Sequence, residues 1–165
     1  MLFLVIQINL SSFVGGFIMN SLKWCFKQNK GIKLVEPNLA IAKKFISDAR
    51  IDLGLIDKKE LKWNIIKEYY VCYNSFYSLL VKCGIKCEIH DCTLKLMGLF
   101  DFKKSVQNKL IDLKKERIGV QYYLDKSKKD YFDFAKSFFD LCEIKFMELN
   151  DFEVKRIRSE LGEKK

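Results

Sequence analysis

Apolar residues recur at steps of three and four along most of this chain, which is the spacing of one face of an α-helix. The first such stretch predicts an amphipathic helix over residues 39–53 that ends at Gly54. Pro37 is expected in its first turn, because the missing N–H of proline costs nothing at that position. The predicted apolar face consists of Leu39, Ala42, Ile46, Ala49 and Leu53.

The strongest pattern lies at residues 60–83, where two apolar stripes overlap on one predicted helix. One stripe runs through Ile66, Tyr69, Tyr73, Phe76 and Leu80, and the other through Ile65, Tyr69, Cys72, Phe76, Leu79 and Cys83. Two stripes give a wide apolar arc, which is typical of the central helix of a bundle. Gly84 follows at a position where glycine commonly ends a helix.

Further helices complete the prediction. A short helix is expected from Asp91 to Leu99 and a longer one from about Lys103 to Tyr123, and an aromatic-rich helix begins near Ser127. Asn150 followed by Glu153 is typical of a capping box and predicts a last short helix. The expected fold is therefore all-α: an antiparallel up-and-down bundle of four to five helices, with short flanking helices.

The N-terminal 22 residues carry no charge, and Met1–Ile6 is a continuous apolar run, the one place where a strand is expected. The segment has neither the positive start nor the cleavage site of a signal peptide. Polar residues and a glycine pair interrupt it, so we expect no membrane association. Three interpretations stay open for residues 1–18: an extension ahead of a true start at Met19, a packed apolar segment, or an anchor. The predicted domain spans residues 19–165.

The chain of 165 residues fits one domain, and its formal net charge of +9 comes mainly from lysine. Such an excess favours an anionic partner such as RNA, a nucleotide or an acidic protein surface. A solvated lysine-rich surface explains the same charge equally well. We expect no cofactor.

Six cysteines occur in the chain, and most lie within apolar helical patterns. Free cysteine behaves there as a small hydrophobic residue. We therefore expect reduced thiols and a cytoplasmic location rather than a disulfide framework.

Arg117 interrupts the apolar stripe of the helix predicted over 103–123. A core-facing arginine is costly unless it is paired. It either extends its head to solvent or to a carboxylate, or it lines a groove and binds phosphate through its planar fork. Gln121, Tyr122 and Tyr123 follow directly and are the candidate assisting residues.

A second group of reactive side chains lies between residues 83 and 92. Three thiols and an imidazole could bind zinc, although the spacing differs from that of common zinc motifs. These weak candidate ligands are Cys83, Cys87, His90 and Cys92. His90 is also the only histidine of the chain, so any chemistry that needs an imidazole must use it.

Two sequence segments resemble those of the HEPN domain family. The first, Lys62–Met97, contains the paired tyrosines Tyr69 and Tyr70 and then a glycine, a loop and His90. The second, ERIGVQYYLD, matches the family pattern R-x-x-[AV]-[DQ]-Y from Arg117 to Tyr122. The resemblance covers about residues 19–149.

This resemblance implies a bundle of four to five helices that forms a homodimer. Some members of the family pair with a minimal nucleotidyltransferase, and others are metal-independent ribonucleases of toxin–antitoxin systems. In those ribonucleases a histidine follows the arginine after four to six residues, where this chain has Tyr122, Tyr123 and Leu124. His90 could replace that histidine only if the fold brings it close to Arg117.

Three functional hypotheses follow. The first is RNA or nucleotide binding in a basic cleft through Arg117, Gln121, Tyr122 and Tyr123, without efficient catalysis. The second is a ribonuclease that uses Arg117 with His90 or Tyr122. The third is a protein-interaction module in which Arg117 is a buried ion-pair residue.

Overall fold

The structure is a computed structural model, and it describes residues 22–57, 61–126 and 129–164. The interpretations of residues 1–18 and of a start at Met19 lie outside the described residues. A helical stretch at 22–27 leads into the strand β1 (Lys33–Leu34). The remaining elements are α2 (Leu39–Gly54), α3 (Leu61–Lys82), β2 (Ile85–Lys86), α4 (His90–Lys95), the 3₁₀ helix η1 (Leu96–Phe100), α5 (Lys104–Tyr122), α6 (Phe132–Glu148) and α7 (Asp151–Glu163).

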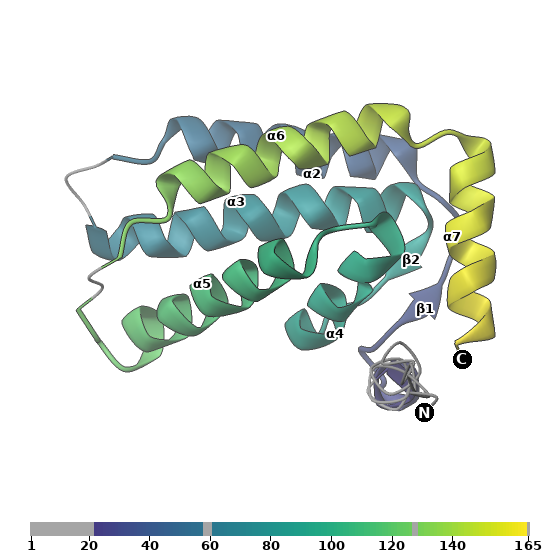
Figure 1. Cartoon of the computed structure of the whole chain (residues 1–165), viewed down its shortest axis with the longest axis horizontal. Helices are drawn as coiled ribbons and strands as arrows, with labels where there is room; N and C mark the ends of the chain where they lie inside the picture. Colours follow the sequence, from purple (N-terminus) through teal and green to yellow (C-terminus); the bar gives the residue numbers. More distant parts are fainter. Residues whose placement is uncertain (1–21, 58–60, 127–128, 165) are drawn as a thin grey trace, which may run out of the picture.

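Helix α3 lies at the centre of the bundle, and α2, α5 and α6 each pack against it. Figure 1 shows α2 and α6 along one side of α3, α5 and α4 along the other, and α7 across one end. The all-α bundle is therefore confirmed. The central position of the aromatic helix is also confirmed. Its residues are buried or partly buried along most of its length, because other helices cover both apolar stripes.

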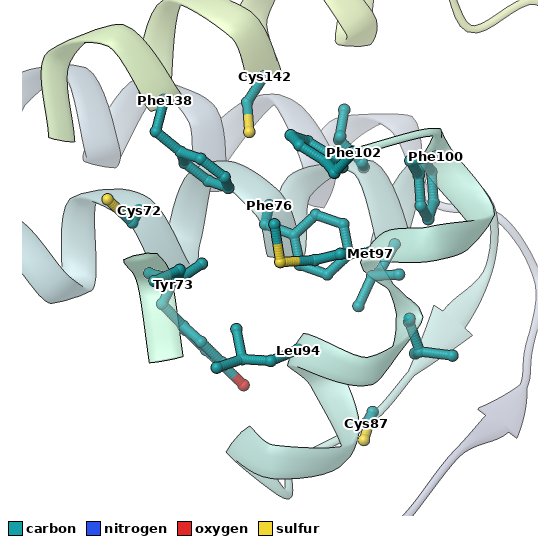
Figure 2. Close-up of a cluster of buried hydrophobic side chains, with 14 of the residues drawn as sticks. Cys72, Tyr73, Phe76, Cys87, Leu94, Met97, Phe100, Phe102, Phe138 and Cys142 are labelled. Carbon is teal, nitrogen blue, oxygen red and sulfur yellow. The ribbon is translucent and has the colours of Figure 1, made fainter. Parts of the chain in front are cut away.

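The core is formed by aromatic and sulfur-containing side chains around the middle of α3. Phe76 is fully buried and contacts the rings of Phe100 and Phe102 edge to face, at 5.5 and 5.6 Å between centroids. Phe102 stacks in turn on Phe138 of α6. Figure 2 shows these rings meeting between α3, η1 and α6, with Met97 beside them. Such edge-to-face and offset pairs add stabilisation beyond the area that they bury.

Capping residues define the helix ends largely as predicted. The side chain of Asn38 accepts a hydrogen bond from the N–H of Ile41, so α2 begins after this cap and Pro37 precedes the helix instead of lying in its first turn. Asn150 caps α7 in the same way through the N–H of Glu153.

Gly84 ends α3 with φ of +67°, a conformation that side chains rarely adopt. A Cβ atom at this position would lie 2.3 Å from the carbonyl oxygen of Val35 and 2.4 Å from a guanidinium nitrogen of Arg158. Arg158 of α7 donates to the carbonyl groups of Val35, Cys83 and Gly84. Glycine is thus required where the end of α3, the segment after β1 and α7 meet.

Two predictions about secondary structure are wrong. The aromatic helix begins at Phe132 and not near Ser127, because Asp130 accepts the N–H of Phe132 and turns the chain there. Strands were expected only within residues 1–6, yet β1 pairs with β2 in antiparallel register, with Lys33 opposite Lys86. The pairing is only two residues long, which leaves almost no periodic signal.

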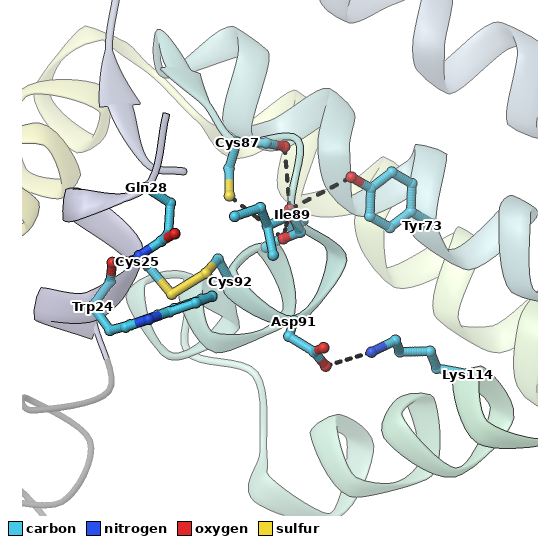
Figure 3. The surroundings of a disulfide bond; sticks show 10 residues. Trp24, Cys25, Gln28, Tyr73, Cys87, Ile89, Asp91, Cys92 and Lys114 are labelled. Atoms are coloured by element: carbon cyan, nitrogen blue, oxygen red, sulfur yellow. Dashed lines mark hydrogen bonds and ion pairs between the residues drawn. A yellow bond between two sulfur atoms is a disulfide. The ribbon is translucent and has the colours of Figure 1, made fainter. Parts of the chain in front are cut away.

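A disulfide bond joins Cys25 to Cys92, and this contradicts the expectation that all cysteines are free thiols. It ties the helical stretch at 22–27 to α4, as Figure 3 shows. The expectation failed because the two residues are 67 positions apart and each lies in an apolar pattern. Among the described residues, Cys72, Cys83, Cys87 and Cys142 are free and buried, as expected.

None of the helices that the structure describes is both long enough and apolar enough to cross a lipid bilayer.

Loss of the disulfide should lower stability under oxidising conditions. A link across 67 positions restricts the unfolded chain, so Cys25→Ala should reduce the free energy of unfolding by about 2–4 kcal/mol. Urea unfolding with and without a dithiol reductant measures the effect. The reductant should weaken the wild-type protein and leave Cys25→Ala unchanged; an equal response of both proteins would contradict the assignment.

Candidate functional site

Arg117 lies on the buried side of α5, where it faces the tyrosines of α3. It is 7 % exposed, and its Nη2 donates a hydrogen bond to the hydroxyl of Tyr70. The guanidinium carbon lies 5.3 and 5.1 Å from the ring centroids of Tyr69 and Tyr70. Tyr122, from the last turn of α5, covers the guanidinium at 5.6 Å. Aromatic faces attract a cation, so these rings hold the arginine in place.

The positive charge of Arg117 has no acidic counterpart within the described part of the chain. None of the ion pairs there includes Arg117. Its Nε is buried and makes no hydrogen bond. A buried charge usually needs an opposite charge and satisfied hydrogen bonds. Among the described residues, Arg117 is therefore a cation with one unused donor and no paired anion.

His90 begins α4 and lies against the tyrosines of α3. Its Nδ1 is 2.5 Å from the hydroxyl oxygen of Tyr69, and its ring stacks on Tyr73 at 4.2 Å between centroids. Burial lowers the pKa of His90 below its usual 6.5, and the charges of Arg117 and Lys114 lower it further. The imidazole is therefore neutral at pH 7.

The hydrogen bond between Tyr69 and His90 joins a phenol to a neutral imidazole. Burial raises the pKa of Tyr69 above its usual 10.0, so the phenol keeps its proton and can donate it to Nδ1. In the tautomer that accepts this proton at Nδ1, the hydrogen of the neutral imidazole is on Nε2, and His90 offers an Nε2–H donor.

Arg117, Tyr122 and His90 are brought together by the fold. Arg117 and His90 both contact Tyr69, and Tyr122 lies over Arg117. His90 and Arg117 therefore lie close to each other within a single chain. We name this group, with Tyr70 and Tyr73, the arginine–tyrosine cluster.

A salt bridge supports the cluster next to His90. Lys114, one turn before Arg117 on α5, pairs with Asp91, which follows His90 on α4. Figure 3 shows this pair beside the disulfide of Cys92 and the hydroxyl of Tyr73. The salt bridge thus links α4 directly to α5 next to His90.

The other predicted binding residues lie at the surface. Gln121 and Tyr123 are exposed, Tyr123 by 74 %, and Tyr122 is 63 % exposed. Helix α5 continues through Gly119 to Tyr122. The glycine leaves room for Asp125, whose carboxylate would lie 2.6 Å from a Cβ atom at this position.

The cleft expected around Arg117 is not among four surface cavities of the described residues. The most apolar of these is lined by Phe45, Tyr77 and Val81, and the others are lined by further residues outside the cluster. Arg117 is instead covered by the side chain of Tyr122. With Arg117 7 % exposed, little of its side chain is open to a ligand in this conformation.

The weak zinc candidates do not form a site. The sulfur of Cys92 is bonded to Cys25, and that of Cys87 lies 3.5 Å from the carbonyl oxygen of Ile89. Burial raises the pKa of Cys83 to about 12, so this thiol keeps its proton. The described residues contain no group of three or more acidic, histidine or cysteine side chains that could hold a metal ion.

From the sequence, Tyr70 was used only for the family resemblance and was not assigned to the site, and Tyr69 and Tyr73 were placed on the apolar stripes of the central helix. Tyr70 lies outside both apolar stripes of α3, yet it provides the hydroxyl that binds Arg117. Its position next to the apolar stripes, but outside them, could have indicated a site residue. A tyrosine at such a position is half-buried, and its hydroxyl needs a polar partner.

Comparisons with family models, with curated proteins and with solved structures find no match to this chain.

The cluster predicts a depressed pKa for His90, below 6.5. Arg117→Gln should raise that pKa, because it removes a neighbouring positive charge. Imidazole NMR signals report the titration without ambiguity, since the chain has one histidine. Because the unfolded chain binds this proton more readily, the folded protein should lose stability as pH falls below 6.5.

Arg50→Gln provides the control, because Arg50 pairs with Glu143 away from the cluster. It should leave the titration of His90 unchanged. A wild-type pKa at or above 6.5 would contradict the geometry described for the cluster.

Proposed function

We propose that this chain is a HEPN-like protein that binds RNA or a nucleotide through Arg117. The observation that carries the proposal is the buried guanidinium with an unused Nε donor and no carboxylate partner among the described residues. A phosphate group would supply both the missing charge and the missing acceptor. The planar fork of arginine suits phosphate particularly well.

Neighbouring groups support a phosphate ligand that carries a base. Tyr122 is the exposed cover of Arg117, and an aromatic ring at this position can stack on a base once it has moved. The Nε2–H of His90 adds a neutral donor, while Gln121 and Tyr123 extend the site along the surface. The net charge of +9 attracts an anionic ligand at long range.

The surroundings of Arg117 do not support the hypothesis of a protein-interaction module. That hypothesis requires Arg117 to be a buried ion-pair residue, and its described surroundings are aromatic instead. Assembly as a homodimer and association with a nucleotidyltransferase remain parts of the proposal that rest on the sequence resemblance alone.

Arg117→Lys should weaken binding of a labelled single-stranded RNA by about tenfold or more. Lysine keeps the charge but loses the fork, and hydrogen bonds to charged groups are worth about 1.5–3 kcal/mol. Fluorescence anisotropy at fixed salt measures the affinity, and circular dichroism checks that the variant is folded.

The matched control is Arg50→Lys, which makes the same exchange at an exposed ion pair. Its affinity should stay within about twofold of wild type. If both variants bind like the wild type, lysine-rich surface attraction accounts for the binding and Arg117 has no part in it.

A metal-independent ribonuclease is the second candidate, and the contact of both His90 and Arg117 with Tyr69 favours it. A neutral imidazole can act as a general base near neutral pH. The purified protein should then cut RNA in the presence of a metal chelator, and His90→Ala should abolish the cutting. Intact RNA after prolonged incubation with folded wild-type protein would remove this candidate, as would equal cutting by His90→Ala.

A further inference from the structure

Glu68 and Asn64 are two buried polar residues that the arginine–tyrosine cluster does not use. They are 2 % and 4 % exposed, and they lie one turn apart on the same side of α3. Each leaves one buried oxygen without a hydrogen-bond donor: Oε2 of Glu68 and Oδ1 of Asn64. Two unsatisfied acceptors in a core are costly, because each has lost its hydration.

The orientation of Asn64 is set by the chain before α3. Its Nδ2 donates to the carbonyl oxygen of Asp57, so a flip of the amide would place two acceptors together. Oδ1 must therefore stay an acceptor. Side chains four residues apart on a helix are neighbours. Glu68, four residues after Asn64 on α3, carries the other buried oxygen without a hydrogen-bond donor.

The surroundings of Glu68 disfavour its charged form. Asp130, before α6, is the charged group that acts on it most, and the thiol of Cys72 lies one turn further along α3. Arg117 of α5 contacts the rings of Tyr69 and Tyr70 instead. No lysine or arginine of the described residues forms an ion pair with Glu68.

The buried faces of α2 and α6 carry no charged side chain that could compensate a charge on Glu68. The buried side of α2 consists of Ala42, Ile46 and Ala49. The buried face of α6 contributes Ala135, Phe138, Phe139 and Cys142, none of them charged. The backbone N–H of Tyr131 is the group that favours the carboxylate, and burial outweighs it.

We propose that Glu68 is held as a neutral acid whose Oε2–H donates to Oδ1 of Asn64, and that loss of this proton loosens the start of α6. A proton on Oε2 of Glu68 turns that oxygen into a donor, and Oδ1 of Asn64 then accepts the hydrogen bond, so both oxygens gain a partner. The remaining oxygen of the acid faces the N–H of Tyr131, at the residue before α6. When the proton leaves, a carboxylate stays in the core beside Asp130, and no cation of the described residues is paired with it.

The balance of protons gives the direction of the pH response. The pKa of Glu68 is raised from 4.5 to about 7, first by burial and then by the charge of Asp130. The folded chain therefore binds this proton more tightly than the unfolded chain does. The contribution to stability is complete below pH 4.5 and is lost as pH rises through about 7.

Glu68→Gln tests the proposal because glutamine imitates the neutral acid. Its amide can donate to Asn64 and accept from Tyr131, but it cannot ionise. The urea midpoint of the wild-type protein should fall between pH 5 and pH 8.5 by more than that of Glu68→Gln, and the variant should be the more stable protein at the higher pH. Glu148→Gln, an exposed glutamate near the end of α6, should keep the wild-type profile.

Two further measurements locate the proton. The amide NMR signal of Tyr131 should titrate with a midpoint near 7 in the wild type and should not titrate in Glu68→Gln. Asn64→Ala, which removes the acceptor, should move that midpoint to lower pH. An unchanged midpoint in Asn64→Ala would overturn the bridge to Asn64.

The stability of Glu68→Gln can also overturn the proposal as a whole. If Glu68→Gln is less stable than the wild type at pH 8.5, or does not fold, then the charged carboxylate stabilises the protein and the proposal is wrong. Neither result bears on RNA binding, because the proposal does not rest on the function assigned to Arg117.

Discussion

The structure depends on the burial of α3, a helix of 22 residues that is covered by other helices on several sides. Burial of its aromatic residues supplies much of the core, but it also takes the tyrosine hydroxyls out of water. Each hydroxyl then needs a partner from a neighbouring element. Tyr69 finds His90, Tyr70 finds Arg117, and Tyr73 lies 3.5 Å from the hydroxyl of Thr93.

This requirement links packing to the candidate site. The partners of the tyrosines come from α4 and α5, so those helices are fixed by polar contacts as well as by apolar area. Side chains that would be costly in an ordinary core become tolerable there: an arginine between rings and a neutral histidine on a stack. The chemistry of the cluster is thus a result of how the central helix is covered.

The helices could be predicted from sequence because their apolar residues follow one period and because residues such as Gly84, after α3, and Asn150, before α7, mark their ends. The pairing of β1 with β2 and the disulfide could not, since each joins distant segments with no local pattern. Arg117 stood out because it broke a stripe. The convergence of His90 with it could not be read from spacing, because it depends on how α4 packs against α3.

Arg158 has a consequence for the rate of folding. Its guanidinium bonds to the carbonyl group of Val35, which is 123 positions earlier in the chain. Helical bundles usually fold fast because most of their contacts are local. Here the end of the central helix is completed only when the first and last described segments meet, so the search for that contact should make this bundle fold more slowly than its helix content suggests.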